Sequence, residues 1–125
     1  MMKILISIKP DYADKILNGK KHFEYRKTIF KKTDIKKVLI YATAPVGKII
    51  GEFEIDQIIS NSPNQVWEET KHYSGISEDF FNEYFKGRSL AHAIKIANVK
   101  AYKTPISLNE LKEGLKAPQS FVYIN

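Results

Sequence analysis

The residues of this chain that could do chemistry lie together in one short polar stretch, residues 19–26. If this stretch is a β-strand, alternation places His22, Glu24 and Arg26 on one face and two aromatic residues on the other. Lys21 and Glu24 could then form a lysine–carboxylate pair, in which a desolvated lysine acts as a base and the carboxylate holds its position. Arg26 could form forked hydrogen bonds to a phosphate or to the edge of a base.

The same residues also allow a simpler interpretation. A surface salt bridge between Glu24 and either Lys21 or Arg26 is worth only ~0–1 kcal/mol and has no functional role. If the stretch is a site, aromatic side chains such as Tyr25 and Tyr41 could offer stacking faces to a splayed base. The residues alone leave the two interpretations open.

All of the excess positive charge of the chain lies in residues 20–37. This segment has eight lysine and arginine residues against Glu24 and Asp34, so its net charge of +6 equals that of the whole chain. One contiguous basic segment indicates a local patch for a polyanion, although a solubilising lysine-rich loop has the same composition. The patch beside the polar stretch comprises Lys20, Lys27, Lys31, Lys32, Lys36 and Lys37.

The composition and spacing exclude several kinds of site. The chain has no cysteine, which excludes disulfides, a thiolate nucleophile and cysteine metal sites. His22, His72 and His92 are far apart and lack metal-ligand spacing. A glycine-rich phosphate loop and a serine nucleophile motif are also missing from the sequence. We therefore expect neither a metal nor another cofactor.

Periodicity, caps and turn residues predict strands with short helices between them. Strands are indicated over residues 2–8, the polar stretch, 36–42, 47–59, 90–102 and 121–124. Helices are expected between Pro10 and Gly19 and after the serine caps Ser62, Ser77 and Ser107. Gly51, inside the longest predicted strand, indicates a bend or a bulge.

This order of elements predicts an α+β fold. The strands are too many for one flat sheet with a single helical layer. We therefore expect one domain over residues 1–125, a small, mostly antiparallel, partly closed β-barrel flanked by short helices. No apolar run approaches the ~18 residues of a membrane span, and the apolar start of the chain is too short for a signal peptide. We expect a soluble cytoplasmic protein without a membrane partner.

The polar stretch also resembles the signature of a known family. Its spacing is G-x-K-x-x-E-x-R, which is similar to the motif of the ASCH domain family, in the PUA-like superfamily of small barrels. The motif residues are Gly19, Lys21, Glu24 and Arg26. The resemblance extends over nearly the whole chain, through Ser7 and Lys9, Tyr41-Ala42-Thr43, Gly47 and Pro118-Gln119-Ser120-Phe121.

The resemblance implies a cleft that binds RNA or a nucleotide-like ligand. It assigns Lys21, Glu24 and Arg26 to the cleft lining, and Lys9, Tyr41 and Thr43 are further candidates for ligand binding. Some members of the family resemble amidohydrolases that remove the acetyl group of acetylated cytidine with a lysine, a threonine and a glutamate.

In this chain Lys21 matches the lysine of that branch, and Glu24 occupies the threonine position. The acidic position falls near Ser74, with Glu69 and Glu78 close in the sequence. Other members of the family resemble ribonucleases.

Three functions therefore remain open. The first is an RNA- or nucleotide-binding module that acts in RNA metabolism or regulation. The second is a small hydrolase, an amidohydrolase on an acylated nucleoside or a ribonuclease, in which Lys21 is the base and Glu24 orients it or shuttles the proton. The third is a sensor of a small anionic ligand, with Arg26 as the anion clamp. Whether the protein is an enzyme stays open, as does its oligomeric state.

Overall fold

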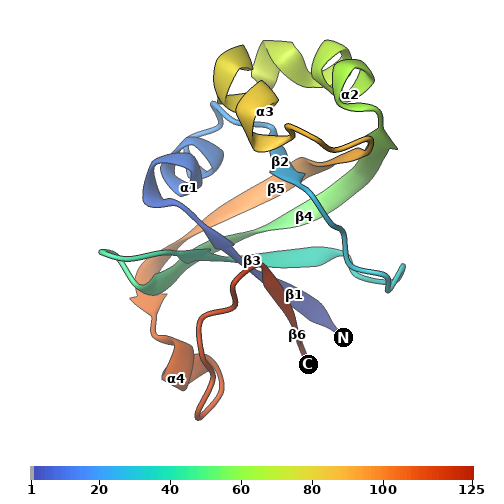
Figure 1. Ribbon diagram of the computed structural model, residues 1–125. Helices are drawn as coiled ribbons and strands as arrows, with labels where there is room; N and C mark the ends of the chain where they lie inside the picture. The colour runs from blue at the N-terminus through green and yellow to red at the C-terminus, as the bar shows by residue number, and fades with distance from the viewer. Residues whose placement is uncertain (1) are drawn as a thin grey trace.

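Six strands form one curled sheet in the computed structural model, which describes residues 2–125 (Figure 1). The strands are β1 (Lys3–Ile8), β2 (Phe23–Arg26), β3 (Lys37–Ala42), β4 (Lys48–Asn61), β5 (Ala91–Ile106) and β6 (Phe121–Ile124). Their order across the sheet is β2-β5-β4-β3-β1-β6, and only β1 and β3 pair in parallel. The predicted α+β fold with a mostly antiparallel, partly closed barrel is confirmed as a half-barrel.

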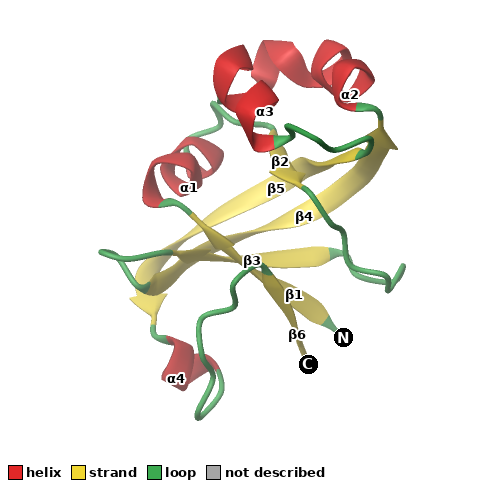
Figure 2. Ribbon diagram, in the orientation of Figure 1, coloured by secondary structure: helices red, strands yellow, loops and turns green. Residues whose placement is uncertain are grey.

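Short helices lie at the two ends of this sheet (Figure 2). They are α1 (Pro10–Leu17), α2 (Pro63–Thr70), the 3-10 turn η1 (Lys71–Tyr73), α3 (Glu78–Tyr84) and α4 (Leu108–Leu111). In Figure 1, α1, α2 and α3 gather near β2, whereas α4 lies at the opposite end of the molecule. Within residues 2–125, none of the helices is both long and apolar enough to cross a membrane.

The serine caps act as the sequence indicates. The side chains of Ser62, Ser77 and Ser107 each accept a hydrogen bond from the backbone N–H three residues later. The Glu110 side chain in turn accepts a hydrogen bond from the backbone N–H of Ser107, which completes a capping box. These bonds satisfy N–H groups that have no partner inside the helix, so local sequence sets where each helix begins.

The long strand β4 bends where the sequence predicts. Its register with β5 shifts between Ile49 and Gly51. A Cβ atom on Gly51 would lie 2.6 Å from the Lys100 carbonyl oxygen and 2.8 Å from a methyl carbon of Leu17. Only glycine lets β5 and α1 approach this point so closely.

Buried apolar residues form three clusters, one of which attaches the helices to β2. Alternation along β1 sends Ile4 into one cluster and Leu5 into another, on opposite faces of the sheet. The third cluster joins β2 and β5 to α2 and α3 through Phe23, Tyr25, Val66, Phe81, Phe85, Ala91 and Ala93. Because Phe23 and Tyr25 face this cluster, Glu24 and Arg26 face the other way, as strand alternation predicts.

Some boundaries differ from the prediction. The strand of the polar stretch begins only at Phe23, because Lys20 and Lys21 complete the turn after α1, where both backbone N–H groups donate to the Lys15 carbonyl. β5 continues to Ile106, four residues beyond the predicted end, because it stays paired with β4. The 3-10 turn η1 has no counterpart among the predicted helices.

Candidate functional site

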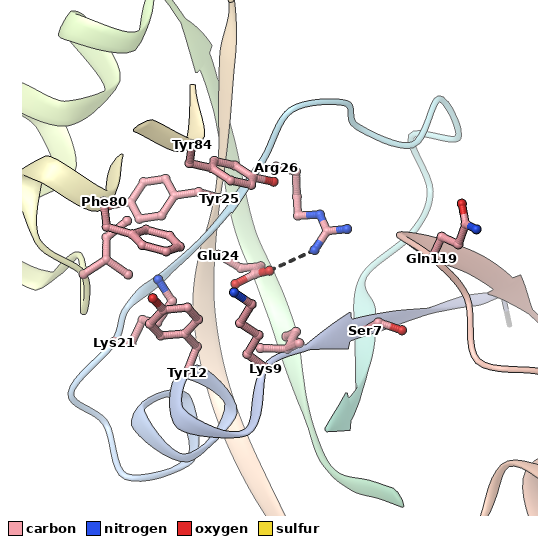
Figure 3. Close-up of a pocket in the computed structure, with 12 residues that line it drawn as sticks. Ser7, Lys9, Tyr12, Lys21, Glu24, Tyr25, Arg26, Phe80, Tyr84 and Gln119 are labelled. Atoms are coloured by element: carbon pink, nitrogen blue, oxygen red, sulfur yellow. Dashed lines mark hydrogen bonds and ion pairs between the residues drawn. The ribbon is translucent and has the colours of Figure 1, made fainter. Parts of the chain in front are cut away.

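A cavity of about 260 Å³ lies where β1, α1, β2 and α3 meet (Figure 3). Five of the candidate residues from the sequence line it: Lys9, Lys21, Glu24, Arg26 and the stacking candidate Tyr25. Ser7 and Gln119 of the family pattern also line it, and the structure adds the aromatic rings of Tyr12, Phe80 and Tyr84. Within the polar stretch, Lys21, Glu24, Tyr25 and Arg26 therefore lie in the wall of a cavity and do not form an exposed stripe.

Lys21 is the most deeply buried charged group of this wall, with 2% of its surface exposed. Its Nζ donates a hydrogen bond to the Ser74 carbonyl at 2.8 Å and lies 4.7 Å from the ring centroid of Tyr25. Burial lowers the pKa of Lys21 from 10.5 to about 8, although Glu24 opposes this shift. A lysine with this pKa is partly neutral near neutral pH, so it can accept a proton as well as hold a charge.

The turn that follows η1 covers Lys21. Gly75 has a φ of +72°, and a Cβ atom there would lie only 2.5 Å from Cγ of Lys21. Lys15 donates from Nζ to the Gly75 carbonyl at 3.1 Å, and the His22 N–H donates to the Tyr73 carbonyl at 2.9 Å. A glycine is required because both the backbone conformation and the contact with Lys21 exclude a side chain. The family resemblance pointed to position 74, whereas no signal in the sequence marked Gly75.

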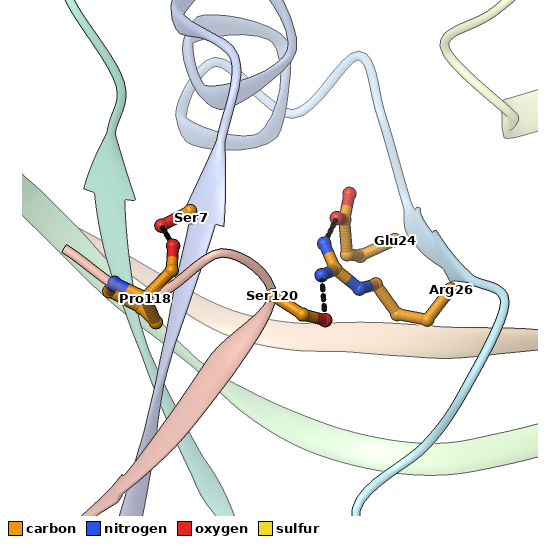
Figure 4. Close-up of polar contacts among 5 residues, drawn as sticks. All are labelled: Ser7, Glu24, Arg26, Pro118 and Ser120. Atoms are coloured by element: carbon orange, nitrogen blue, oxygen red, sulfur yellow. Dashed lines mark hydrogen bonds and ion pairs between the residues drawn. The ribbon is translucent and has the colours of Figure 1, made fainter.

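Glu24 and Arg26 form an ion pair inside the cavity wall (Figure 4). Nη1 of Arg26 lies 3.1 Å from Oε2 of Glu24, and their side chains are 13% and 9% exposed. Nη2 of Arg26 donates to the hydroxyl of Ser120. The Ser7 hydroxyl donates to the Pro118 carbonyl at 2.6 Å and so ties this C-terminal segment to β1. The guanidinium is therefore held in one orientation from two sides.

The cavity has more positive than negative groups. Lys9, Lys21 and Arg26 line it together with one carboxylate, Glu24. Glu69 and Glu78 are exposed and are not part of its lining. Position 74 does adjoin Lys21, but through its carbonyl, while the Ser74 hydroxyl donates to the Ile76 carbonyl at 2.8 Å. The third, acidic member of the amidohydrolase set thus has no counterpart in the lining.

Two predicted ligand-binding residues lie away from the cavity. Tyr41 is 9% exposed and packs in the cluster that contains Leu5 and Leu39. Thr43 follows β3, where its N–H donates to the Ile8 carbonyl. Neither side chain is among those that line the cavity. Both positions match the family pattern, and in this fold both are held by contacts within the sheet.

The basic segment divides among several environments. Lys27 leaves the end of β2 and places its Nζ 4.7 Å from the ring centroid of Tyr84, at the cavity. Lys37 forms an ion pair with Glu52 at 2.8 Å on the sheet. The exposed members of the predicted patch that lie elsewhere are Lys20, Lys31, Lys32 and Lys36.

The histidines provide no metal site. Among residues 2–125, no three His, Asp or Glu side chains are close enough together to hold a metal ion. The His22 ring stacks on Tyr73 at 4.5 Å, outside the cavity lining. His92 shares a hydrogen bond of 2.6 Å with the Ser60 hydroxyl, and burial lowers the pKa of His92. Both histidines thus have structural partners.

Comparison with known proteins gives a consistent result. A family model described as a domain of unknown function, DUF365, matches residues 1–113. An "ASCH domain-containing ribonuclease" of Zymomonas mobilis subsp. mobilis is 31% identical over 123 residues, which are 96% of this chain and 82% of that protein. The crystal structure of ASCH from Zymomonas mobilis superimposes with a TM-score of 0.91 at 28% identity and covers 98% of this chain and 87% of that one.

A much longer relative contains a similar segment. The protein named ATP synthase subunit alpha in Ureaplasma parvum serovar 3 is 34% identical over 122 residues, which are 97% of this chain. The chain spans only 15% of the length of that protein. The names of the relatives therefore differ, whereas the matched segment is nearly the whole of this chain in each case. On the family match, the identity and the shared fold, the chain belongs to the ASCH domain family.

Proposed function

We propose that the cavity binds RNA and accepts one unpaired nucleotide at a time. The observation that supports this most is the combination of cations with aromatic rings in one small cavity. Arg26 and Lys9 can hold a phosphate, and the rings of Tyr12, Phe80 and Tyr84 can stack on a base. The volume of about 260 Å³ is just below the roughly 300–1,000 Å³ of ordinary small-molecule sites, so it suits a single nucleotide.

The comparison with relatives supports RNA as the ligand class. The Zymomonas mobilis relative is named a ribonuclease, and its similarity covers 96% of this chain. The fixed orientation of the Arg26 guanidinium also favours binding of a phosphate. Because Glu24 and Ser120 already hold the guanidinium, little conformational freedom is lost when it binds a phosphate.

Binding of labelled unpaired RNA, followed by fluorescence anisotropy at several salt concentrations, tests the proposal. Lys9→Gln removes a cation of the cavity, and Lys112→Gln removes an exposed lysine that does not line it. We expect Lys9→Gln to weaken binding and to reduce the slope of log K against log salt by about 0.7, the value for one phosphate contact on a single strand. Lys112→Gln should change neither. No binding at low salt, or equal effects of the two variants, would contradict the proposal.

A second candidate, cleavage of the bound RNA, is favoured by the pKa of Lys21. Its neutral amine could take the proton of a ribose 2′-hydroxyl, whose oxygen then attacks the adjacent phosphorus. The bond from phosphorus to O5′ breaks, O5′ takes a proton from water, and a 2′,3′-cyclic phosphate forms. Arg26 would stabilise the charge that develops on the phosphoryl oxygens.

The products and the pH dependence test this candidate. We expect the rate to rise with pH and to level off above about pH 8, where Lys21 is neutral. Lys21→Met should abolish formation of the cyclic phosphate, whereas Lys20→Met, a change at the exposed neighbouring lysine, should not. Intact RNA after incubation with the wild type, or equal rates for the two variants, would exclude cleavage and leave the binding proposal standing.

A further inference from the structure

Lys21 is a buried amine that reaches the cavity from between aromatic rings and backbone. Its Nζ lies 5.6 Å from the ring centroid of Tyr12 and 4.7 Å from that of Tyr25. Among residues 2–125, the Ser74 carbonyl is the one hydrogen-bond acceptor that Nζ contacts. An ammonium group has three N–H donors, so these surroundings favour the neutral amine, whose lone pair stays available to a ligand in the cavity.

A neutral amine in a site with little water is a nucleophile as well as a base. Lysines that are desolvated in apolar pockets form imines, also called Schiff bases, with carbonyl compounds. Formation of an imine releases water, so a site that keeps water away from the amine favours the adduct and slows its hydrolysis. Lys21 meets this condition, because it is 2% exposed and the turn at Gly75 lies over its stem.

Two further cations of the lining can hold an anionic part of the same ligand. In Figure 3 the Glu24 carboxylate lies between the Lys21 amine and the Arg26 guanidinium. Glu24 and Ser120 already orient this guanidinium, and Lys9 adds a second cation to the lining. Guanidinium and ammonium groups bind phosphate through charge-assisted hydrogen bonds. The cavity therefore combines a nucleophile with a place for a phosphate.

We infer that Lys21 forms an imine with an aldehyde that also carries a phosphate. The Nζ lone pair attacks the aldehyde carbon, Glu24 relays both protons of the nitrogen to the oxygen, and this oxygen leaves as water. Amine and aldehyde thus give imine and water, and no oxidant or reductant takes part. Arg26 and Lys9 hold the phosphate. The aldehyde is a second class of ligand for the cavity, and the inference does not depend on the binding of RNA.

Three related compounds test the inference. Pyridoxal phosphate has the aldehyde and the phosphate, pyridoxine phosphate has an alcohol in place of the aldehyde, and pyridoxine lacks both groups. Borohydride reduces an imine and so fixes the ligand to its amine, and we expect peptide mass mapping to place the pyridoxal phosphate adduct on Lys21. Pyridoxine phosphate should block this adduct, and pyridoxine should need a concentration at least about tenfold higher to do so, because it has no charge for the cations of the cavity.

Variants separate the nucleophile from the phosphate site. Lys21→Met should abolish the adduct, whereas Lys20→Met, a change at the exposed neighbouring lysine, should leave it unchanged. Lys9→Gln removes a cation of the lining but keeps the nucleophile. It should raise the concentration of pyridoxal phosphate that gives half of the adduct by about tenfold.

The mapping uses the wild type, so it decides the question even if Lys21→Met fails to fold. Labelling of exposed lysines such as Lys20 and Lys112 to the same extent as Lys21, or equal competition by pyridoxine and pyridoxine phosphate, would overturn the inference. An unmodified Lys21 in a protein that binds unpaired RNA would overturn the imine and leave the RNA proposal standing. An adduct on Lys21 in a protein that does not bind RNA would do the reverse.

Discussion

Lys21 and Lys37 lie near the two ends of one basic segment, yet the fold shifts their pKa values in opposite directions. Lys21 is 2% exposed, and burial lowers its pKa to about 8. Lys37 begins β3 and remains partly exposed, and its hydrogen bond with Glu52 raises its pKa. The same residue type, sixteen positions apart, is thus a buried amine with a lowered pKa in one region and a paired, partly exposed cation in the other.

The difference shows that burial decides what a charge does. Removing an amine from water disfavours its charged form, whereas an exposed partner of opposite charge favours it. At the cavity end, Lys21 has only a carbonyl, the faces of two rings and the nearby Glu24 to compensate for lost water. The fold therefore gives up stability there to hold a desolvated amine, which is typical of functional sites. At the β3 end the hydrogen bond and opposite charge of Glu52 outweigh the desolvation of Lys37, so the charged form of Lys37 is favoured.

The largest expected effect concerns the turn that buries Lys21. Gly75→Ala should destabilise the protein by about 2–4 kcal/mol, because alanine is strained at this φ and its Cβ crowds the stem of Lys21. Gly87→Ala is the matched control, since Gly87 has a similar φ of +78° but nothing within 4 Å of an added Cβ. It should cost only about 1–2 kcal/mol. Urea unfolding of both variants measures the difference, and equal losses would show that the turn does not press on Lys21.

The next effect is a dependence of stability on pH at the cavity end. The unfolded chain holds the Lys21 proton up to about pH 10.5, whereas the folded protein releases it near pH 8, so stability rises with pH between these values. We expect the free energy of unfolding of the wild type, relative to Lys21→Met, to increase by about 2 kcal/mol from pH 7 to pH 10. Urea unfolding at both pH values measures it. A stability relative to Lys21→Met that does not change with pH would mean that Lys21 is not desolvated.

The smallest effect is expected at the β3 end. Because the pKa of Lys37 is raised, its ion pair stabilises the fold below the unfolded pKa, and the benefit is lost as the pH rises through the folded value. Because Lys37 keeps a third of its side-chain surface in water, solvent and salt screen this pair, so Lys37→Gln should shift the urea midpoint at pH 7 only slightly, and high salt should reduce that shift. A loss as large as that of Gly75→Ala would remove the contrast between the two regions.

Local patterns were sufficient for most of the fold. Serine caps at positions 62, 77 and 107 predicted three helix starts, and the pattern of residues 2–8 predicted the first strand. These signals act between residues a few positions apart, so they can be read directly from the chain. The length of β5 could not be read from the sequence in this way, because pairing with β4 extends this strand beyond its own alternating pattern.

The cavity could be predicted only in part. Lys21, Glu24 and Arg26 belong to one short stretch, so a single turn and strand bring them to the same wall. Tyr12, Phe80 and Gln119 come from three distant segments, and no local signal marks them as neighbours. Tyr41 was also a candidate, but the fold packs it in a core cluster outside the cavity lining.

The sequence by itself determined the elements, the family and the polar stretch, because each rests on neighbouring residues. The tertiary structure alone decided which of the lysines loses its water. Desolvation depends on what the other segments place around a side chain, here the turn at Gly75 over Lys21 and Glu52 beside Lys37. The sequence determines only the net charge of residues 20–37. The fold decides which of these charges lie at the cavity and which lie on the surface.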